Sequence, residues 1–387
     1  MRGPLSRELR AFLLVLPLIT FLGVFFAWPI WTMVSSSFRN DGLSEALPLT
    51  AAEIRTWDGA GLPSAAVQHA LVEDLRGADR IILGGAVRML NAQVSGFRSL
   101  IPATTKAVQA QEGAVVLSEI DPRWTEPRFW LALRASASPY TDRHLLAAID
   151  LERDASGALK DAGTSNAQIF LRTFTIAGTV TLLCVLIGLP YAMVINAATG
   201  WRKTALLVAV LIPMWTSLLV RSAAWFILLQ DEGLINGALQ ALGLTDGPLA
   251  LIFNRAGVVL AMTHVLLPFM VLPTYTVLTA IPKNLMPAAA SMGATPLRAF
   301  VRVLLPLAMP GVLAGALLTF MVALGYYITP ALVGGPGDQM ISSIIAFYAL
   351  QTANWPMAGA LGLMLLVITT GLYLIYGRLT RANAIGA

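Results

Sequence analysis

The sequence predicts an all-α membrane protein with six transmembrane helices. Hydrophobic residues make up 57% of the 387-residue chain and charged residues only 12%, with a mean hydropathy of +0.72. Soluble domains have about 25% charged residues, so a soluble fold is excluded. Several uncharged runs are long enough to cross about 30 Å of hydrocarbon. The net charge of +5 does not indicate a nucleic-acid partner, because the bases lie mainly at the ends of these runs, as expected beside membrane lipid.

The first apolar run covers residues 11–38 and follows three arginines near the N-terminus. A cleaved signal peptide has an apolar region of about 7–15 residues, which is shorter than this run. The run also ends in the sequence WPIW, an aromatic pattern typical of a membrane interface. We therefore expect residues 1–38 to form an uncleaved first transmembrane helix with the N-terminus inside.

Residues 39–165 have a different composition. They contain 16 of the 21 acidic residues and 13 of the 26 basic residues, a net charge of −3. No stretch there is apolar enough to span a bilayer, and residues 65–112 show helical patterning. We predict a periplasmic insertion of mixed structure. It is either a lid or packing spacer, or an outer platform that contacts a substrate-delivering protein.

Five further apolar runs make residues 166–387 a five-helix core. They lie between Arg172 and Arg202, over 204–230, between Arg255 and Lys283, between Arg302 and Asp338, and between Asp338 and Arg378. With the N-terminus inside, the inner segments hold ten bases and one acid, whereas the outer loops hold four acids. This asymmetry follows the positive-inside rule and places both termini inside.

Prolines lie in or beside most of these spans. A proline removes a backbone hydrogen bond, which lipid cannot replace, so such breaks are tolerated where protein or a water-lined cavity satisfies the backbone. Broken helices of this kind suit alternating access. The residues concerned are Pro190, Pro213, Pro268, Pro273, Pro310, Pro330 and Pro356.

The chain carries no motif for catalysis. It has no GxxxxGK[ST] phosphate loop, no HExxH motif and no GxSxG elbow, and its three histidines are far apart in sequence. The single cysteine, Cys184, lies in an apolar run and is read as a small buried hydrophobe. We expect no enzyme activity, no bound metal and no cofactor.

Ionisable residues inside apolar runs are functional candidates. Arg221 and His264 are the two such side chains, although Arg221 could instead reach the outer headgroups and His264 could be a packing residue. Aromatic side chains nearby in the runs could line a solute path or serve for anchoring. The predicted pathway residues are Trp215, Arg221, Trp225, His264, Tyr326 and Tyr327.

A short, cationic stretch at residues 284–306 separates two apolar runs. Leu285, Ala288, Ala289 and Met292 have the spacing of one helix face. Asn284 is expected to cap this helix, with Pro287 in the first turn. Gly293 stands where the helix should end with φ > 0, and Thr295-Pro296 should open a second helix. The result would be a helix–turn–helix knob on the inner side, suited to docking on a soluble partner.

The segment PAAASMGATPLRAFVRVLLPLAMP resembles the EAA loop of ABC importer permeases, the coupling helix that docks on the ATPase. The matching positions are Ala288, Ala289, Gly293, Phe300, Val303, Leu305 and Pro306. Pro287 departs from the pattern, because the family usually has Glu there. The resemblance therefore implies docking by shape, with Arg298 and Arg302 assisting.

Four further stretches resemble the spermidine/putrescine-type permeases. They are PMWTSLLVRSAAW, EGLINGALQALGL, LLPFMVLPTY and TPALVGGP. The resemblance implies a type I importer core in the bacterial inner membrane and a second permease subunit. It also implies a cytoplasmic ATPase dimer that binds the ATP, and a periplasmic binding protein that delivers a small solute. That solute would be a polyamine or a related amine or opine-like compound.

The spans contain no Asp or Glu that could select a cation. An ion-coupled transporter would also want such carboxylates. A membrane scaffold with an outer interaction module would explain the insertion, but not the inner knob or the prolines.

Overall fold

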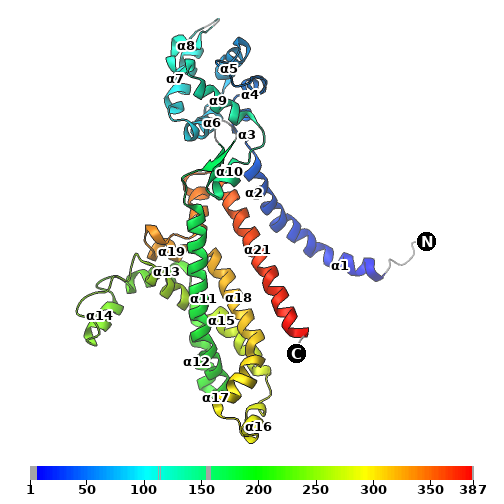
Figure 1. The fold of residues 1–387 in the computed structure, drawn as a ribbon, viewed down its shortest axis with the longest axis vertical. Coiled ribbons are helices and arrows are strands. Elements are labelled where there is room, and N and C mark those ends of the chain that lie inside the picture. Colours follow the sequence, from blue (N-terminus) through cyan, green and yellow to red (C-terminus); the bar gives the residue numbers. More distant parts are fainter. Residues whose placement is uncertain (1–6, 112, 114, 154–157, 386–387) are drawn as a thin grey trace. The chain divides into compact units, whose positions relative to one another are not determined.

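The computed structural model describes residues 7–111, 113, 115–153 and 158–385, and they are almost entirely helical (Figure 1). The chain divides into two compact units. One comprises Met1–Leu146 with Trp355–Ala360, and the other comprises Ala147–Asn354 with Leu361–Ala387. The two units are defined by compactness of the fold and not by position in a membrane. The boundaries expected for the first membrane helix, the insertion and the core therefore stay a prediction.

The first unit begins with the predicted N-terminal membrane helix. It consists of three continuous pieces: α1 (Arg7–Leu22), a π-helical turn η1 (Gly23–Ala27) and α2 (Trp28–Phe38). Within it, Phe12–Phe38 is long and apolar enough to span a membrane. The start of α21 (Trp355–Ile385) packs closely on α2. A Cβ atom added at Gly359 would lie 2.6 Å from Met33 O and Ser37 Oγ, so only glycine permits this approach.

The insertion in this unit folds into a module of short helices. They are α3 (Asp41–Ala46), α4 (Pro48–Ile54), α5 (Ala65–Gly77), α6 (Arg80–Gln93), α7 (Phe97–Ala110), α8 (Leu117–Ile120), η2 (Pro122–Thr125), α9 (Pro127–Ala137) and α10 (Arg143–Ala148). The helical patterning read over residues 65–112 is confirmed by α5, α6 and α7. Leucine, valine and aromatic side chains from these helices bury one another in a single core.

Two tryptophans organise the centre of that core. The Trp124 and Trp130 rings lie 4.9 Å apart, and each indole N–H has a buried acceptor. Trp124 donates to Thr104 Oγ1 at 2.9 Å, and Trp130 donates to the Trp124 carbonyl at 2.9 Å. Because both polar atoms are satisfied, the large rings can be buried without an unpaired donor.

A buried carboxylate fixes the start of α4. Asp74 on α5 accepts from the Leu49 and Thr50 backbone N–H groups at 3.2 and 2.7 Å and from Thr50 Oγ1 at 2.7 Å. The first N–H groups of a helix have no partner within the helix, so a side chain from a neighbouring helix supplies one here.

The second unit begins at the last part of the insertion, where a two-stranded hairpin precedes the core. β1 (Leu151–Arg153) pairs antiparallel with β2 (Leu159–Asp161). Asp150, with φ 61°, accepts from Thr164 Oγ1 and from the backbone N–H groups of Asn166 and Ala167 at 2.7 and 2.8 Å. Burial opposes ionisation of Asp150, but these hydrogen bonds prevail and lower the pKa of its carboxyl. The hairpin is thus fastened to the first turn of the next helix.

Helices make up the rest of this unit. They are α11 (Asn166–Ala197), α12 (Gly200–Trp215), α13 (Leu218–Leu228), α14 (Leu234–Ala241), α15 (Arg255–Ala280), α16 (Leu285–Ser291), α17 (Pro296–Ala299), η3 (Phe300–Leu304), α18 (Leu305–Gly325), α19 (Ile328–Val333), η4 (Pro336–Asp338), α20 (Ile341–Ala346), η5 (Phe347–Gln351) and the remainder of α21.

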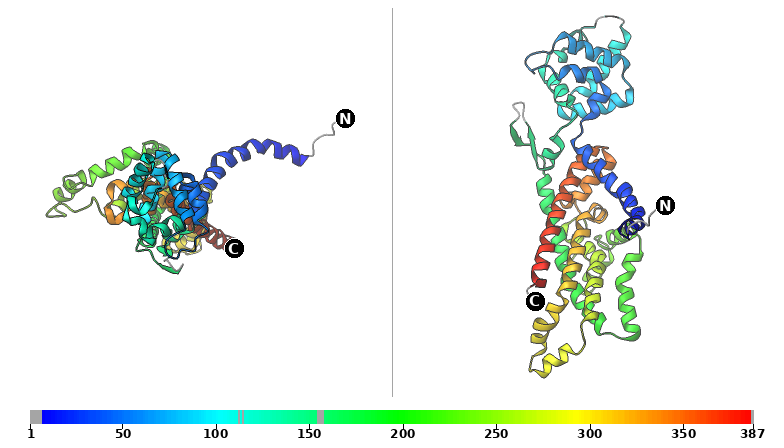
Figure 2. Two further views of the ribbon diagram at one scale, coloured as in Figure 1. Left: turned by 90° about the horizontal axis from the view of Figure 1, so that it is seen from above. Right: turned by 90° about the vertical axis from the view of Figure 1, so that its right-hand side faces the viewer.

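Three long helices form the centre of the second unit. α11, α15 and α18 pack on one another, and Figures 1 and 2 show them side by side in green, yellow-green and gold. Gly311 and Gly315 lie four residues apart on α18, where they let α15 approach. A Cβ atom at Gly315 would lie 2.8 Å from Met270 O. Small residues at this spacing let two membrane helices pack with their backbones close together.

The run over residues 204–230 differs from the expected single span. α12 and α13 meet at an angle of 101°, with Thr216 and Ser217 between them. Hydropathy shows only that the run is apolar and cannot reveal a bend in it. The local sequence signal for the break is Pro213, which lies about one turn before it. The described residues thus hold five helices able to cross a membrane, or six if the bent pair is one span.

Candidate functional site

The loop at residues 284–306 has the predicted helix–turn–helix form. α16 ends at a Gly293 with φ 84°, and two hydrogen bonds close the end of the helix. The Gly293 N–H donates to Ala290 O at 2.9 Å and the Ala294 N–H to Ala289 O at 3.0 Å, the pairing of a Schellman motif. Thr295 Oγ1 then accepts from the Arg298 N–H at 3.4 Å and opens α17. The loop is therefore a defined turn between two helices.

Two details of the loop differ from the sequence expectation. Asn284 stands at the N-cap position, but its side chain makes no capping hydrogen bond, since its backbone is already helical. The predicted apolar face also divides. Ala289 is 3% exposed and packs inward, whereas Ala288 is exposed and Met292 is 84% exposed.

The outer surface of the loop combines apolar and cationic side chains. Leu297 is 72% exposed, and Arg298 and Arg302 are exposed as well. Pro287, Gly293 and Pro306 are exposed too, and α16 has no acidic residue in its first turn. An apolar knob with a basic rim is a surface suited to a protein partner.

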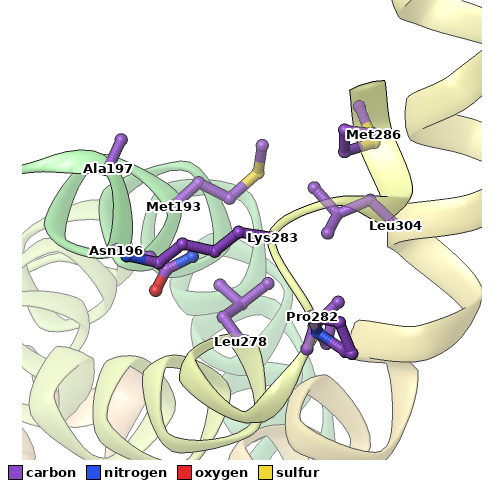
Figure 3. Close-up of a pocket in the computed structure, with 9 residues that line it drawn as sticks. Met193, Asn196, Ala197, Leu278, Pro282, Lys283, Met286 and Leu304 are labelled. Atoms are coloured by element: carbon purple, nitrogen blue, oxygen red, sulfur yellow. The ribbon is translucent and has the colours of Figure 1, made fainter. Parts of the chain in front are cut away.

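A cavity of about 340 Å³ lies behind this loop (Figure 3). In Figure 3 the side chains of Met193 and Leu304 point toward each other across it, and Lys283 extends along it toward Asn196. Its lining is Met193, Asn196, Ala197, Leu278, Ile281, Pro282, Lys283, Met286 and Leu304. The loop therefore lies beside open space as well as on the helical core.

A second group of candidate residues forms a polar cluster between α13, α15 and the end of α18. The Trp225 Nε1–H donates to His264 Nδ1 at 3.2 Å, and the two rings meet edge to face with their centres 5.4 Å apart. His264 is exposed on α15, although its neighbours Thr263 and Val265 are buried. An exposed imidazole in the middle of an apolar helix indicates a surface that faces water or protein, not lipid.

Arg221 on α13 belongs to the same cluster. Its guanidinium lies close enough to His264 and to Tyr326 to act electrostatically on both. Arg221 Nε is buried without a hydrogen-bond partner in the described part of the chain, and so is the Tyr326 hydroxyl, although Thr329 is nearby. The structure thus brings together four of the six pathway candidates: Arg221, Trp225, His264 and Tyr326.

The other two candidates are not joined to this cluster. Trp215 is 72% exposed at the end of α12, and Tyr327 is 40% exposed beyond α18. Conversely, sequence reasoning missed Ser222 and Thr329, whose hydroxyl oxygens lie 2.8 Å apart in a buried contact between α13 and α19. The sequence gives only a weak indication that these two residues are special, because small hydroxyl residues are common in membrane helices.

The residues described offer little for metal chemistry. No group of three or more His, Cys, Asp or Glu side chains gathers among them. Cys184 is buried, with Sγ 3.5 Å from Thr263 O.

Comparison with known proteins identifies the family. Residues 184–384 match the family described as "Binding-protein-dependent transport system inner membrane component". The chain is 32% identical over 214 residues to the spermidine/putrescine transport system permease protein PotB of Escherichia coli K12, covering 55% of this chain and 78% of PotB. It is 36% identical to the inner membrane ABC transporter permease protein YdcU of the same strain, covering 55% of this chain and 71% of YdcU.

Among solved structures, a bacterial alginate ABC transporter in complex with an alginate-bound periplasmic protein aligns with a TM-score of 0.47 at 20% identity, covering 57% of this chain and 80% of that one. The predicted resemblance to spermidine/putrescine-type permeases is confirmed by the similarity to PotB. The chain therefore belongs to the family of binding-protein-dependent transport system inner membrane components, the permease subunits of ABC importers.

Proposed function

We propose that this chain passes a small solute through the bacterial inner membrane, driven by a separate ATPase that docks on residues 284–306. Membership in the family makes it a multi-pass permease and not an enzyme. The further proposal is a six-span topology with both termini inside, in which α12 and α13 count as one span. Residues 1–38 would be the first helix, 39–165 the periplasmic insertion and 166–387 the core.

The observation that carries the coupling role is the exposed, closed turn at Gly293. Two large apolar side chains, Met292 and Leu297, stand uncovered on this defined turn, and a docked protein would bury them. A cytoplasmic ATPase would cover these side chains, and Arg298 and Arg302 would contact its rim. Because Pro287 replaces an acidic residue, shape would carry the contact in place of a charge at that position.

The polar cluster supports a role in the solute path. A cationic side chain facing lipid is costly, so Arg221 and the exposed His264 are best accommodated beside a water-filled path or another protein subunit. Trp225 would hold His264 in place through its indole hydrogen bond. The bend between α12 and α13, and α15 with Pro268 and Pro273 inside it, would open and close this path as the ATPase subunits move.

The substrate is proposed from the relatives. PotB is named for spermidine and putrescine transport, and its similarity supports a polyamine or a related amine or opine-like compound. A second permease subunit and a periplasmic binding protein would complete the importer, and the insertion is a candidate platform for the latter.

Co-purification from the native membrane tests this proposal. We expect an ATPase and a second permease to accompany the chain, and ligand-loaded binding protein to stimulate ATP hydrolysis. Leu297→Asp should release the ATPase, because a charge would enter the apolar docking surface. Leu244→Asp is the matched control, since Leu244 is similarly exposed between α14 and α15. Equal retention of the ATPase by both variants would refute the docking role.

A further inference from the structure

The cluster around Arg221 carries a positive charge that the described chain does not neutralise. Arg221 Nε is buried without a hydrogen-bond partner, and none of the ion pairs among described residues includes Arg221. The membrane-capable helices contain no Asp or Glu. A buried guanidinium nitrogen needs an anionic or strongly polar acceptor, and the described residues supply none.

The Tyr326 hydroxyl is a second unsatisfied group at the same place. It is buried without a hydrogen-bond partner and lies within electrostatic range of Arg221. The neighbouring Thr329 hydroxyl already faces Ser222 Oγ at 2.8 Å. Arg221 Nε and the Tyr326 hydroxyl are thus two buried groups without a hydrogen-bond partner among the described residues.

The rest of the cluster adds no negative charge. His264 Nδ1 accepts the Trp225 indole hydrogen bond, so this imidazole is in its neutral form with the proton on Nε2. The Trp225 ring is held by that bond and lines the cluster. What remains is one fixed positive charge beside aromatic surface. This environment repels a second cation and favours a planar anion that can accept two parallel N–H bonds.

We propose that Arg221 and Tyr326 bind a carboxylate group of the transported solute, which is therefore a small amine bearing an acid group and not a bare polyamine. This rests on the proposed permease function and narrows its substrate class. Arg221 would donate two parallel N–H bonds to the carboxylate, and Tyr326 would donate one further hydrogen bond to it. The Trp225 face would contact the carbon chain or the ammonium group.

Two probes that differ at a single end test the proposal. Putrescine and 4-aminobutanoate share a four-carbon chain with one ammonium, and the other end is an ammonium or a carboxylate. The purified complex in lipid nanodiscs is titrated with each while tryptophan fluorescence is recorded, with sodium chloride at equal ionic strength as the blank. Trp225→Phe identifies the part of the signal that comes from this cluster.

We expect 4-aminobutanoate to bind at least tenfold more tightly than putrescine. Arg221→Gln should remove at least tenfold of that affinity, Arg221→Lys less, and Tyr326→Phe about threefold, because one hydrogen bond is lost. Arg255→Gln is the matched control, since that guanidinium has its own partner in Asp338 at 3.2 Å. It should leave the preference unchanged.

Three results would overturn the inference. They are no response to 4-aminobutanoate, an equal or stronger response to putrescine, or a preference that persists in Arg221→Gln. Release of the second permease subunit by Arg221→Gln would overturn it as well, because the missing partner would then be a carboxylate of that subunit. The coupling proposal is judged separately: Gly293→Asp should lower uptake and leave the probe response intact.

Discussion

Gly293 allows a quantitative test of the proposed coupling loop at residues 284–306. Its φ of 84° lies in the left-handed region, but a Cβ atom added there meets nothing within 4 Å. A substitution is therefore opposed by backbone strain and not by a clash within the chain. The strain is about 1–2 kcal/mol for an ordinary L-residue and less for Asn or Asp, which reach this conformation more easily.

This strain would reduce the population of the closed turn about 5- to 30-fold, since 1.4 kcal/mol corresponds to a factor of ten. We therefore expect ATPase-coupled uptake to fall in the order Gly293→Asn, Gly293→Ala, Gly293→Val, with Asn closest to the natural protein. Gly293→Asp should be worse than Asn, because it adds a charge to a surface that must dock. The measurement is uptake at equal membrane expression, with Gly178→Ala on α11 as the control in open space. If Ala and Val match glycine, the turn does not carry coupling and the reasoning fails.

Three further perturbations follow from packing and charge. Gly315→Val should lower the thermal midpoint of unfolding, because its Cβ would press on Met270 O and overpacking costs about 1–3 kcal/mol. The control Gly178→Val should leave the midpoint unchanged, since its Cβ lies in open space. Equal midpoints for the two variants would argue against close α15–α18 packing. Asp74→Ala should lower the free energy of unfolding by about 3 kcal/mol, because the start of α4 loses its acceptor. Denaturant unfolding of the full chain measures this change, and a decrease below about 1 kcal/mol would contradict the prediction. Burial, reinforced by the neighbouring Arg143 charge, lowers the pKa of His144 from 6.5 to about 4. The unfolded chain therefore binds the proton first as pH falls, so stability should decline by up to about 3 kcal/mol between pH 6.5 and 4, and His144→Gln should flatten that decline.

Much of the loop could be predicted because its signals are local. Gly293 and the Thr295-Pro296 pair act within a few residues of their own position, so their spacing specified the turn before any tertiary contact was considered. The same holds for the apolar helices, whose length and composition are enough to predict spanning segments. The exposure of Met292 was not predictable from spacing, because helical periodicity says which residues share a face but not whether anything covers it.

The polar cluster could be predicted only in part. Arg221 and His264 were found singly, because an ionisable residue in an apolar run is rare. Their proximity depends on α13 turning away from α12, and hydropathy carries no information about that angle. The contact between Ser222 and Thr329 joins positions 107 residues apart, and neither residue has a distinctive local pattern.

The break between α12 and α13 has a consequence for hydration. The last carbonyl groups of α12 and the first N–H groups of α13 lie outside the helical hydrogen-bond ladder, and Ser217 supplies no side-chain cap. Hydrocarbon cannot solvate such groups, so water has to reach them or another subunit has to cover them. We therefore predict that the backbone amides at this break exchange with deuterium while those of α11 and α15 stay protected.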